Sequence, residues 1–181
     1  MDATPATRTF RIEAVVTPTP TPTVTPTPTP TVTPTPTAVE EESTVSGTVP
    51  TVLGLVLDGT AAFPPFIPGV ATEYQASIAA RITTSAATAE LTVVDQGAQP
   101  GRLVNATHAL VNALEARATN ATQPTAAFAP ISATPLRLLT YPSYVAGDPV
   151  AIGFRQRIGA TEPLWAGAYE KTLTFTLSTQ P

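Results

Sequence analysis

The sequence contains no cysteine, one histidine and one lysine, and these absences exclude several kinds of chemistry. Without cysteine there is no disulfide, no cysteine nucleophile and no thiolate metal site. Any Ser-His-Asp triad would have to use His108, which has no nucleophile elbow near it in the sequence. A zinc site usually takes several His or Cys ligands. We therefore expect a protein that is not an enzyme and that needs no cofactor.

Charged residues make up only 12% of the chain, and the net charge is −4. The arginines and the single lysine form no basic cluster, so we expect no nucleic-acid partner. No run of apolar residues is long enough to suggest a membrane span, and no secretory signal precedes Asp2. Abundant threonine with few charges favours β-structure and an extracellular or cell-surface location.

The stretch Thr17–Thr37 alternates threonine with proline or valine, and eight of its 21 residues are proline. Proline fixes φ near about −65° and pushes the preceding residue toward extended geometry. The pattern therefore predicts a polyproline II rod of ~65 Å. Runs of Thr-Pro are also typical of O-glycosylated stalks. The candidate O-glycosylation sites are Thr17, Thr19, Thr21, Thr23, Thr25, Thr27, Thr29, Thr31, Thr33, Thr35 and Thr37.

A half-buried β-strand is predicted before the rod, within residues 1–16. Its apolar face would carry Phe10, Ile12, Ala14 and Val16, and its other face Thr9, Arg11, Glu13 and Val15. A lone strand is not stable in water, because its backbone groups and its apolar face both need partners. The strand therefore implies a complementary apolar groove in some folded domain.

The rod limits where this strand can go. A compact domain of about 139 residues has a diameter of roughly 35–40 Å, which is shorter than a rod of ~65 Å. We therefore expect the strand to reach the domain of a neighbouring copy. Two alternatives are a strand that folds back on its own domain, with the rod bent at Val24 or Val32, and a disordered tail.

An acidic junction, residues 38–43, separates the rod from the predicted domain at 44–181. Its Glu40, Glu41 and Glu42 are interpreted as a solvated cap, with a ligand site as the alternative. Two Asn-Ala-Thr sequences beyond it make Asn105 and Asn120 candidate N-glycosylation acceptors.

Short alternating segments fill the rest of the chain and predict an all-β fold. The expected strands are Val45–Pro50, Val52–Asp58, Thr72–Thr84, Glu90–Val94, Leu114–Thr119, Leu136–Tyr141, Val150–Ile158 and Thr172–Ser178. Seven or eight such strands with Gly/Pro/Asp turns between them indicate an antiparallel β-sandwich, either Ig-like or a jelly roll. One of those turns is placed at Gly147-Asp148-Pro149. A short helix over His108–Arg117 is an alternative for that region.

The inward faces of these strands follow from the alternation. Leu53, Leu55 and Leu57 form one of them, and the inward set after Val150 includes Gln156 as a polar exception. Trp165 is interpreted as a packing residue, although an indole in that position could also stack on a sugar.

The order of an N-terminal strand, a spacer and an incomplete β-sandwich resembles subunits of prokaryotic surface filaments that are joined by donor-strand complementation. The positions that carry this resemblance are Phe10, Ile12, Ala14 and Val16. The stretch Ala166–Tyr169 and the strand after it are similar to the closing strand of secreted bacterial Ig-like modules. The resemblance implies an extracellular structural subunit that forms a homopolymer. The alternative is an adhesive or carbohydrate-binding module on a Thr/Pro stalk, with surface carbohydrate as its partner.

We predict that the domain needs no metal ion, because Asp58, Asp95 and Asp148 lie in separate turns and no Asp-x-Asp loop occurs. The thermal midpoint should be the same with and without EDTA. A large drop in the midpoint with EDTA would reveal an ion site and contradict this expectation.

Overall fold

The computed structural model describes residues 40–179, which form ten β-strands and no helix. The strands are β1 (Leu53–Asp58), β2 (Thr72–Thr84), β3 (Ala89–Val94), β4 (Val104–Asn105), β5 (His108–Ala109), β6 (Glu115–Thr119), β7 (Ala129–Pro130), β8 (Leu136–Tyr141), β9 (Val145–Ile158) and β10 (Thr174–Thr179). The chain divides into two units, Met1–Val45 and Ser46–Pro181. In the first unit only residues 40–45 are described, and they are exposed and irregular.

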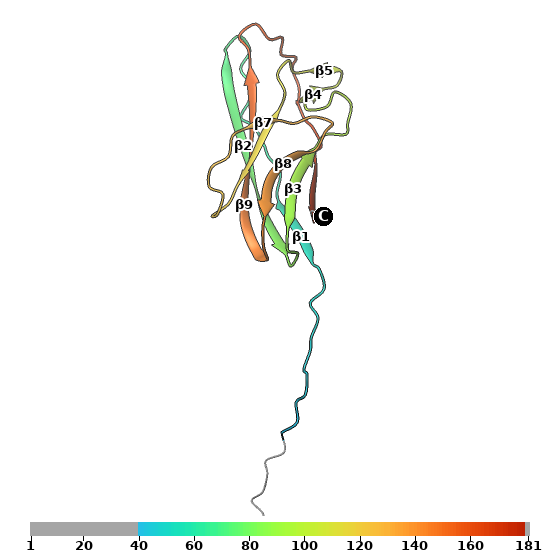
Figure 1. The fold of residues 1–181 in the computed structure, drawn as a ribbon. Coiled ribbons are helices and arrows are strands. Elements are labelled where there is room, and N and C mark those ends of the chain that lie inside the picture. Colours follow the sequence, from blue (N-terminus) through green and yellow to red (C-terminus); the bar gives the residue numbers. More distant parts are fainter. Residues whose placement is uncertain (1–39, 180–181) are drawn as a thin grey trace, which may run out of the picture. The chain divides into compact units, whose positions relative to one another are not determined.

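The strands of the second unit form two main sheets (Figure 1). One sheet has the order β1-β2-β9-β6-β7 and the other has the order β10-β3-β8, while β4 and β5 form a separate small hairpin. All pairs within these sheets are antiparallel. The prediction of an all-β, antiparallel fold is confirmed.

The hydrophobic core lies between the inner faces of the two main sheets. Strand alternation sends every second side chain inward, and Ile82 of β2, Leu91 of β3 and Ile152 of β9 have no exposed surface. Side chains of this size each contribute about 1.5–3 kcal/mol when fully buried. Gln156 is buried among them as expected, and its Nε2 donates to the backbone oxygens of Asn112 and Arg157.

Two local predictions are wrong. The expected strand Val45–Pro50 is irregular and has no strand partner within residues 40–179, and Val49 is 84% exposed. The alternative helix over His108–Arg117 is also absent, because its backbone bonds to distant segments instead. Leu110 N donates to Leu103 O, and Leu114 N donates to Gly101 O. These long-range bonds replace the local bonds that a helix would need.

The predicted turn at Gly147-Asp148-Pro149 is wrong as well, because these residues lie inside β9, which begins at Val145. The pairing of β9 with β2 shifts register between Ile82 and Thr84. Gly147 has a φ of 65° at this irregularity, a conformation that glycine adopts without strain. A bulge therefore continues the strand where the sequence signals a stop.

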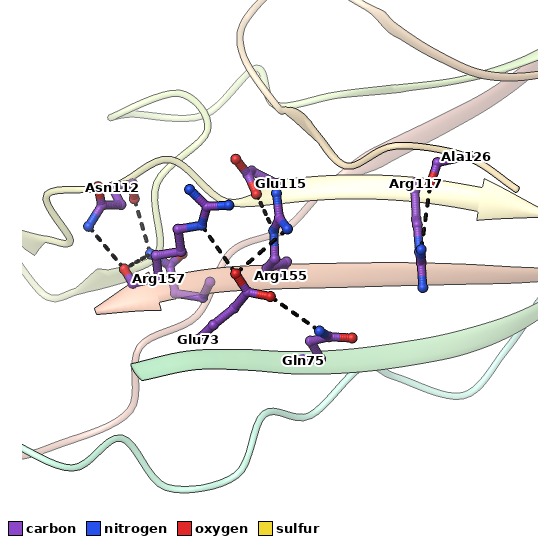
Figure 2. A network of polar contacts seen from close by, with 9 residues as sticks. Glu73, Gln75, Asn112, Glu115, Arg117, Ala126, Arg155 and Arg157 are labelled. Carbon is purple, nitrogen blue, oxygen red and sulfur yellow. Dashed lines mark hydrogen bonds and ion pairs between the residues drawn. The ribbon is translucent and has the colours of Figure 1, made fainter. Parts of the chain in front are cut away.

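The outer face of the five-stranded sheet carries a polar network (Figure 2). Glu73 of β2 pairs with both Arg155 and Arg157 of β9, and Arg155 also pairs with Glu115 of β6. Arg155 lies over the ring of Phe128 at 4.5 Å. Partly exposed ion pairs of this kind contribute little to stability. The network therefore marks this face as the solvent side of the sheet.

A buried ion pair closes one end of the domain. Asp95 follows β3 and is fully buried, and its Oδ2 lies 3.0 Å from the Nζ of Lys171, the only lysine. The Asp95 carboxylate also accepts hydrogen bonds from Gly97 N and Gly101 N. Gly101 has a φ of 72°, and a Cβ there would lie 1.9 Å from Ile131 O, so only glycine fits.

The surroundings of Asp95 set its charge state. Burial alone would raise the pKa of Asp95, but the hydrogen bonds from Lys171, Gly97 and Gly101 and the charge of Lys171 outweigh it. The pKa therefore lies below its usual value of 3.8. A carboxylate whose pKa is lowered by folding stabilises the domain above the unfolded pKa, and this contribution is lost as the pH falls through the folded pKa.

We predict that Lys171→Met lowers the free energy of unfolding by about 3–5 kcal/mol at pH 7, because it leaves the Asp95 carboxylate buried without its cation. Urea unfolding at pH 7 measures this loss. Below about pH 3.8 the wild-type domain should lose stability more steeply than Asp95→Asn, which has no carboxylate to titrate. Equal pH profiles for the wild type and Asp95→Asn would contradict the assigned role of Asp95.

Candidate functional site

The five-stranded sheet has an incomplete edge. Strand β1 ends at Asp58 and pairs only with residues 79–84 of β2. The other half of β2, Thr72–Ile78, pairs with β9 on one side and with no strand of the described residues on the other. Backbone N–H and C=O groups at such an edge are available to an added strand.

The sequence after β1 explains why the sheet stops there. The connection from Gly59 to Ala71 links β1 to β2 and contains Phe63-Pro64-Pro65-Phe66. Proline has no N–H to donate to a sheet ladder, so this stretch cannot continue β1. The connection instead runs as an irregular segment with most of its side chains exposed.

An apolar pocket of about 830 Å³ lies beside this connection. The pocket is lined in part by residues of both main sheets and of the segment that precedes β10. The lining side chains used below are Leu57, Ile78, Phe154, Leu173 and Phe175. Ile78 and Phe175 are only partly buried, whereas Ile82 lies on the same face of β2 as Ile78 and has no exposed surface. The core is therefore less completely covered at Ile78, beyond the end of β1, than at Ile82, which lies beside β1.

The expected inward face of β1 is correspondingly less buried than the alternation predicts. Leu55 packs against the core, but Leu53 and Leu57 are each 40% exposed. The face predicted to point inward is only partly covered, and β1 is an edge strand with no neighbour on its outer side among residues 40–179. Leu57 still points inward, since it lines the apolar pocket.

An exposed aromatic pair lies at the rim of the pocket. Trp165 lines the pocket, is 56% exposed and stacks on His108 with ring centroids 4.3 Å apart and planes at 15°. The backbone N–H of Trp165 donates to the hydroxyl of Tyr169. Trp165 does not belong to the core cluster: the residue is 56% exposed, and its ring stacks on the exposed side chain of His108. Sugar stacking on this ring stays a prediction.

The two candidate N-glycosylation residues already use their amide nitrogens in the folded domain. Asn105 Nδ2 donates to the backbone oxygens of Trp165 and Ala166. Asn120 is buried, and its Nδ2 lies 2.7 Å from Asp148 Oδ2, which also accepts from Tyr141. Burial and the neighbouring Asp148 carboxylate raise the pKa of Tyr141, so its hydroxyl stays a donor. Glycosylation of either asparagine remains a prediction.

The other predicted site residues lie outside the described part of the chain. These are the N-terminal strand, Thr9–Val16, and the candidate O-glycosylation threonines of Thr17–Thr37. Within residues 40–179 no three His, Cys, Asp or Glu side chains gather into a group that could hold a metal ion. The same residues include no helix long and apolar enough to cross a membrane.

The sequence did not reveal the pocket, because its lining residues on the strands are explained equally well as parts of a core face. Ile78, Phe154 and Phe175 all alternate correctly within their strands. The available signal was the aromatic-proline run Phe63–Phe66, which interrupts the chain between two strands that pair with each other. This run follows the end of β1, beyond which the edge of β2 has no paired strand among the described residues.

Comparison with known proteins gives little guidance. No protein family and no curated protein matches the sequence. A solved structure described as "Chaperone-tip adhesin complex is vital for synergistic activation of CFA/I fimbriae biogenesis" is similar with a TM-score of 0.45 and 11% identity. The match covers 70% of this chain and 42% of that one, so the chain spans less than half the length of that structure. A likeness this distant supports no conclusion about function.

The open pocket predicts different costs for two isoleucines on the same face of β2. In a chain that lacks residues 1–37, Ile82→Ala should lower the free energy of unfolding by about 2–5 kcal/mol, as for a fully buried side chain. Ile78→Ala should cost clearly less, because Ile78 borders open space. Denaturant unfolding measures both, and an equal cost would mean that the pocket is closed in solution.

Proposed function

We propose that this protein is an extracellular structural subunit built on a β-sandwich, which polymerises by inserting its N-terminal strand into a neighbouring copy. The observation that supports this most directly is the apolar pocket beside the unpaired half of β2. An added strand at Thr72–Ile78 would extend the five-stranded sheet and fill the pocket from its open side. This is β-strand addition, a recurring mode of peptide recognition.

The dimensions and the pattern of the two partners agree. The unpaired part of β2 is seven residues long, and the apolar face of the N-terminal strand, from Phe10 to Val16, also spans seven residues. At ~3.3 Å per residue each is roughly 23 Å long. The donor's apolar side chains would enter the pocket, while Arg11 and Glu13 would lie on the polar outer face near Glu73.

The rod favours a neighbouring copy over the chain's own domain. A spacer with the predicted polyproline II geometry would span ~65 Å, which is more than the roughly 35–40 Å expected for the domain. Such a spacer would present the strand to the next subunit more readily than to its own domain. Repeated head-to-tail, this contact is heterologous and generates a filament.

The binding free energy would come from two sources. Burial of Phe10 and Ile12 would contribute about 1.5–3 kcal/mol each. Each new main-chain hydrogen bond to β2 would add about 0.5–1.5 kcal/mol net. These terms would have to exceed the entropic cost of association and of ordering the donor strand, and the assembly would then need no covalent link.

One observation favours a second candidate function, an adhesive or carbohydrate-binding module on a Thr/Pro stalk. The exposed ring of Trp165 could stack on a sugar. This function would not need the N-terminal strand, so the two candidates differ in what Phe10–Val16 does.

We predict that Ile12→Asp abolishes assembly and leaves the domain folded, because a carboxylate in an apolar pocket without a partner is costly. Thr9→Asp is the matched control, since Thr9 lies on the opposite face of the predicted strand and its charge would face solvent. Size-exclusion chromatography and negative-stain microscopy should show filaments for the wild type and Thr9→Asp, and monomers for Ile12→Asp.

Other results would point to other functions. A strand that folds back on its own domain predicts that Ile12→Asp destabilises a monomer and leaves its assembly state unchanged. A full-length protein that stays monomeric at high concentration, together with a synthetic Thr7–Val16 peptide that does not bind it, would refute strand donation and favour the stalked binding module.

A further inference from the structure

The connection from Gly59 to Ala71, here called the strap, lies along the edge of β2 that lacks a strand. Among its side chains only Phe63 and Phe66 are partly buried, and the rest are exposed. A single hydrogen bond joins the strap to the strands within the described residues, from Ile67 N to Tyr74 Oη at 2.8 Å. A connection of this length without secondary structure is uncommon in compact domains and is often functional.

Aromatic contacts provide most of the attachment of the strap. The ring of Phe66 packs edge-on against Tyr74 with centroids 4.9 Å apart, and lies 6.2 Å from the ring of Tyr169. Phe63 packs on Phe66 at 5.9 Å. The strap therefore covers the apolar inner side of the β2 edge with two rings, and its backbone forms no ladder with β2 among residues 40–179.

We propose that the strap occupies the entrance to the pocket in the free subunit and is displaced when a donor strand enters. This inference rests on the strand donation proposed above. Pro64 and Pro65 have no N–H to donate, and among residues 40–179 the strap forms no ladder with β2, so it shields the edge without pairing with the edge's backbone groups. A donor strand satisfies those groups and fills the pocket, so exchange of strap for strand is favourable. In the free subunit the strap protects an exposed edge from wrong partners.

The exchange of strap for donor strand predicts how the affinity for the donor strand depends on the strap. A ligand that binds only the open state has an apparent dissociation constant equal to the intrinsic constant divided by the open fraction. Loosening the strap without altering the pocket should therefore tighten binding of the donor strand. Tyr74→Phe is the conservative way to do this, because it removes only the hydroxyl that accepts from Ile67 N.

The test uses the full-length Ile12→Asp chain, whose own strand is disabled, titrated with the synthetic peptide Thr7–Val16. Trp165 is the only tryptophan and lines the pocket, so its fluorescence reports occupancy. Adding Tyr74→Phe should tighten peptide binding by up to roughly tenfold, the limit for a strap that is closed about nine-tenths of the time and is fully released by the substitution. Val70→Ala is the matched control within the strap, because Val70 is 48% exposed and does not line the pocket, and it should leave the affinity unchanged.

Chymotrypsin gives an independent measure of displacement, because the Phe66–Ile67 bond is the strap's cleavable site and Phe63 is followed by proline. Saturating peptide should accelerate cleavage after Phe66. If the peptide binds but neither its affinity nor the cleavage rate changes, the strap stays in place and this inference is wrong, while the proposed function stands. If the peptide binds none of the variants, strand donation itself fails and this inference fails with it.

Discussion

The short length of β1 is the constraint on which the rest of the candidate site depends. It pairs with β2 for six residues and ends at Asp58, opposite Ala79. Strand β2 extends beyond this point by the seven residues Thr72–Ile78. Where β1 has ended, the edge of β2 has backbone N–H and C=O groups that no strand of the described residues pairs with, and another strand could bond to them. The inner-face side chains at the same edge border the apolar pocket. The strap and the apolar pocket are consequences of that one early termination.

The remainder of the domain is arranged so that this edge can stay open without loss of the fold. The core cluster includes Ile82, Leu91 and Ile152, and Ile82 lies beside β1. The buried pair of Asp95 and Lys171 holds the loop after β3, with Lys171 also donating to the backbone oxygens of Ala98 and Gln99. Segments that are displaced during binding are found where local stability is low. The strap fits this rule, because it has few hydrogen bonds to the strands within the described residues.

Secondary structure was predictable where alternation is unambiguous. The bounds of β2 and β8 follow directly from period-two patterns, because one face of each strand meets the core and the other meets solvent. Two of the errors come from pairing with other segments of the chain. Residues 108–117 could not be recognised as non-helical without knowing that Leu103 and Gly101 accept hydrogen bonds from Leu110 and Leu114. Gly147 is interpreted from the sequence as part of a turn, whereas it belongs to a bulge of β9 opposite β2.

Composition and alternation predict the all-β fold that residues 40–179 adopt, and they also predict an amphipathic strand before a Thr/Pro spacer. These predictions depend on local composition and periodicity, which the chain carries in every conformation. The place where the core is incomplete follows only from how the strands pack in space. Ile78 and Ile82 have the same local pattern, yet one borders the pocket and the other is fully buried. The burial of each side chain depends on which strands pack against it, and this cannot be predicted from the residue or from its neighbours in the sequence.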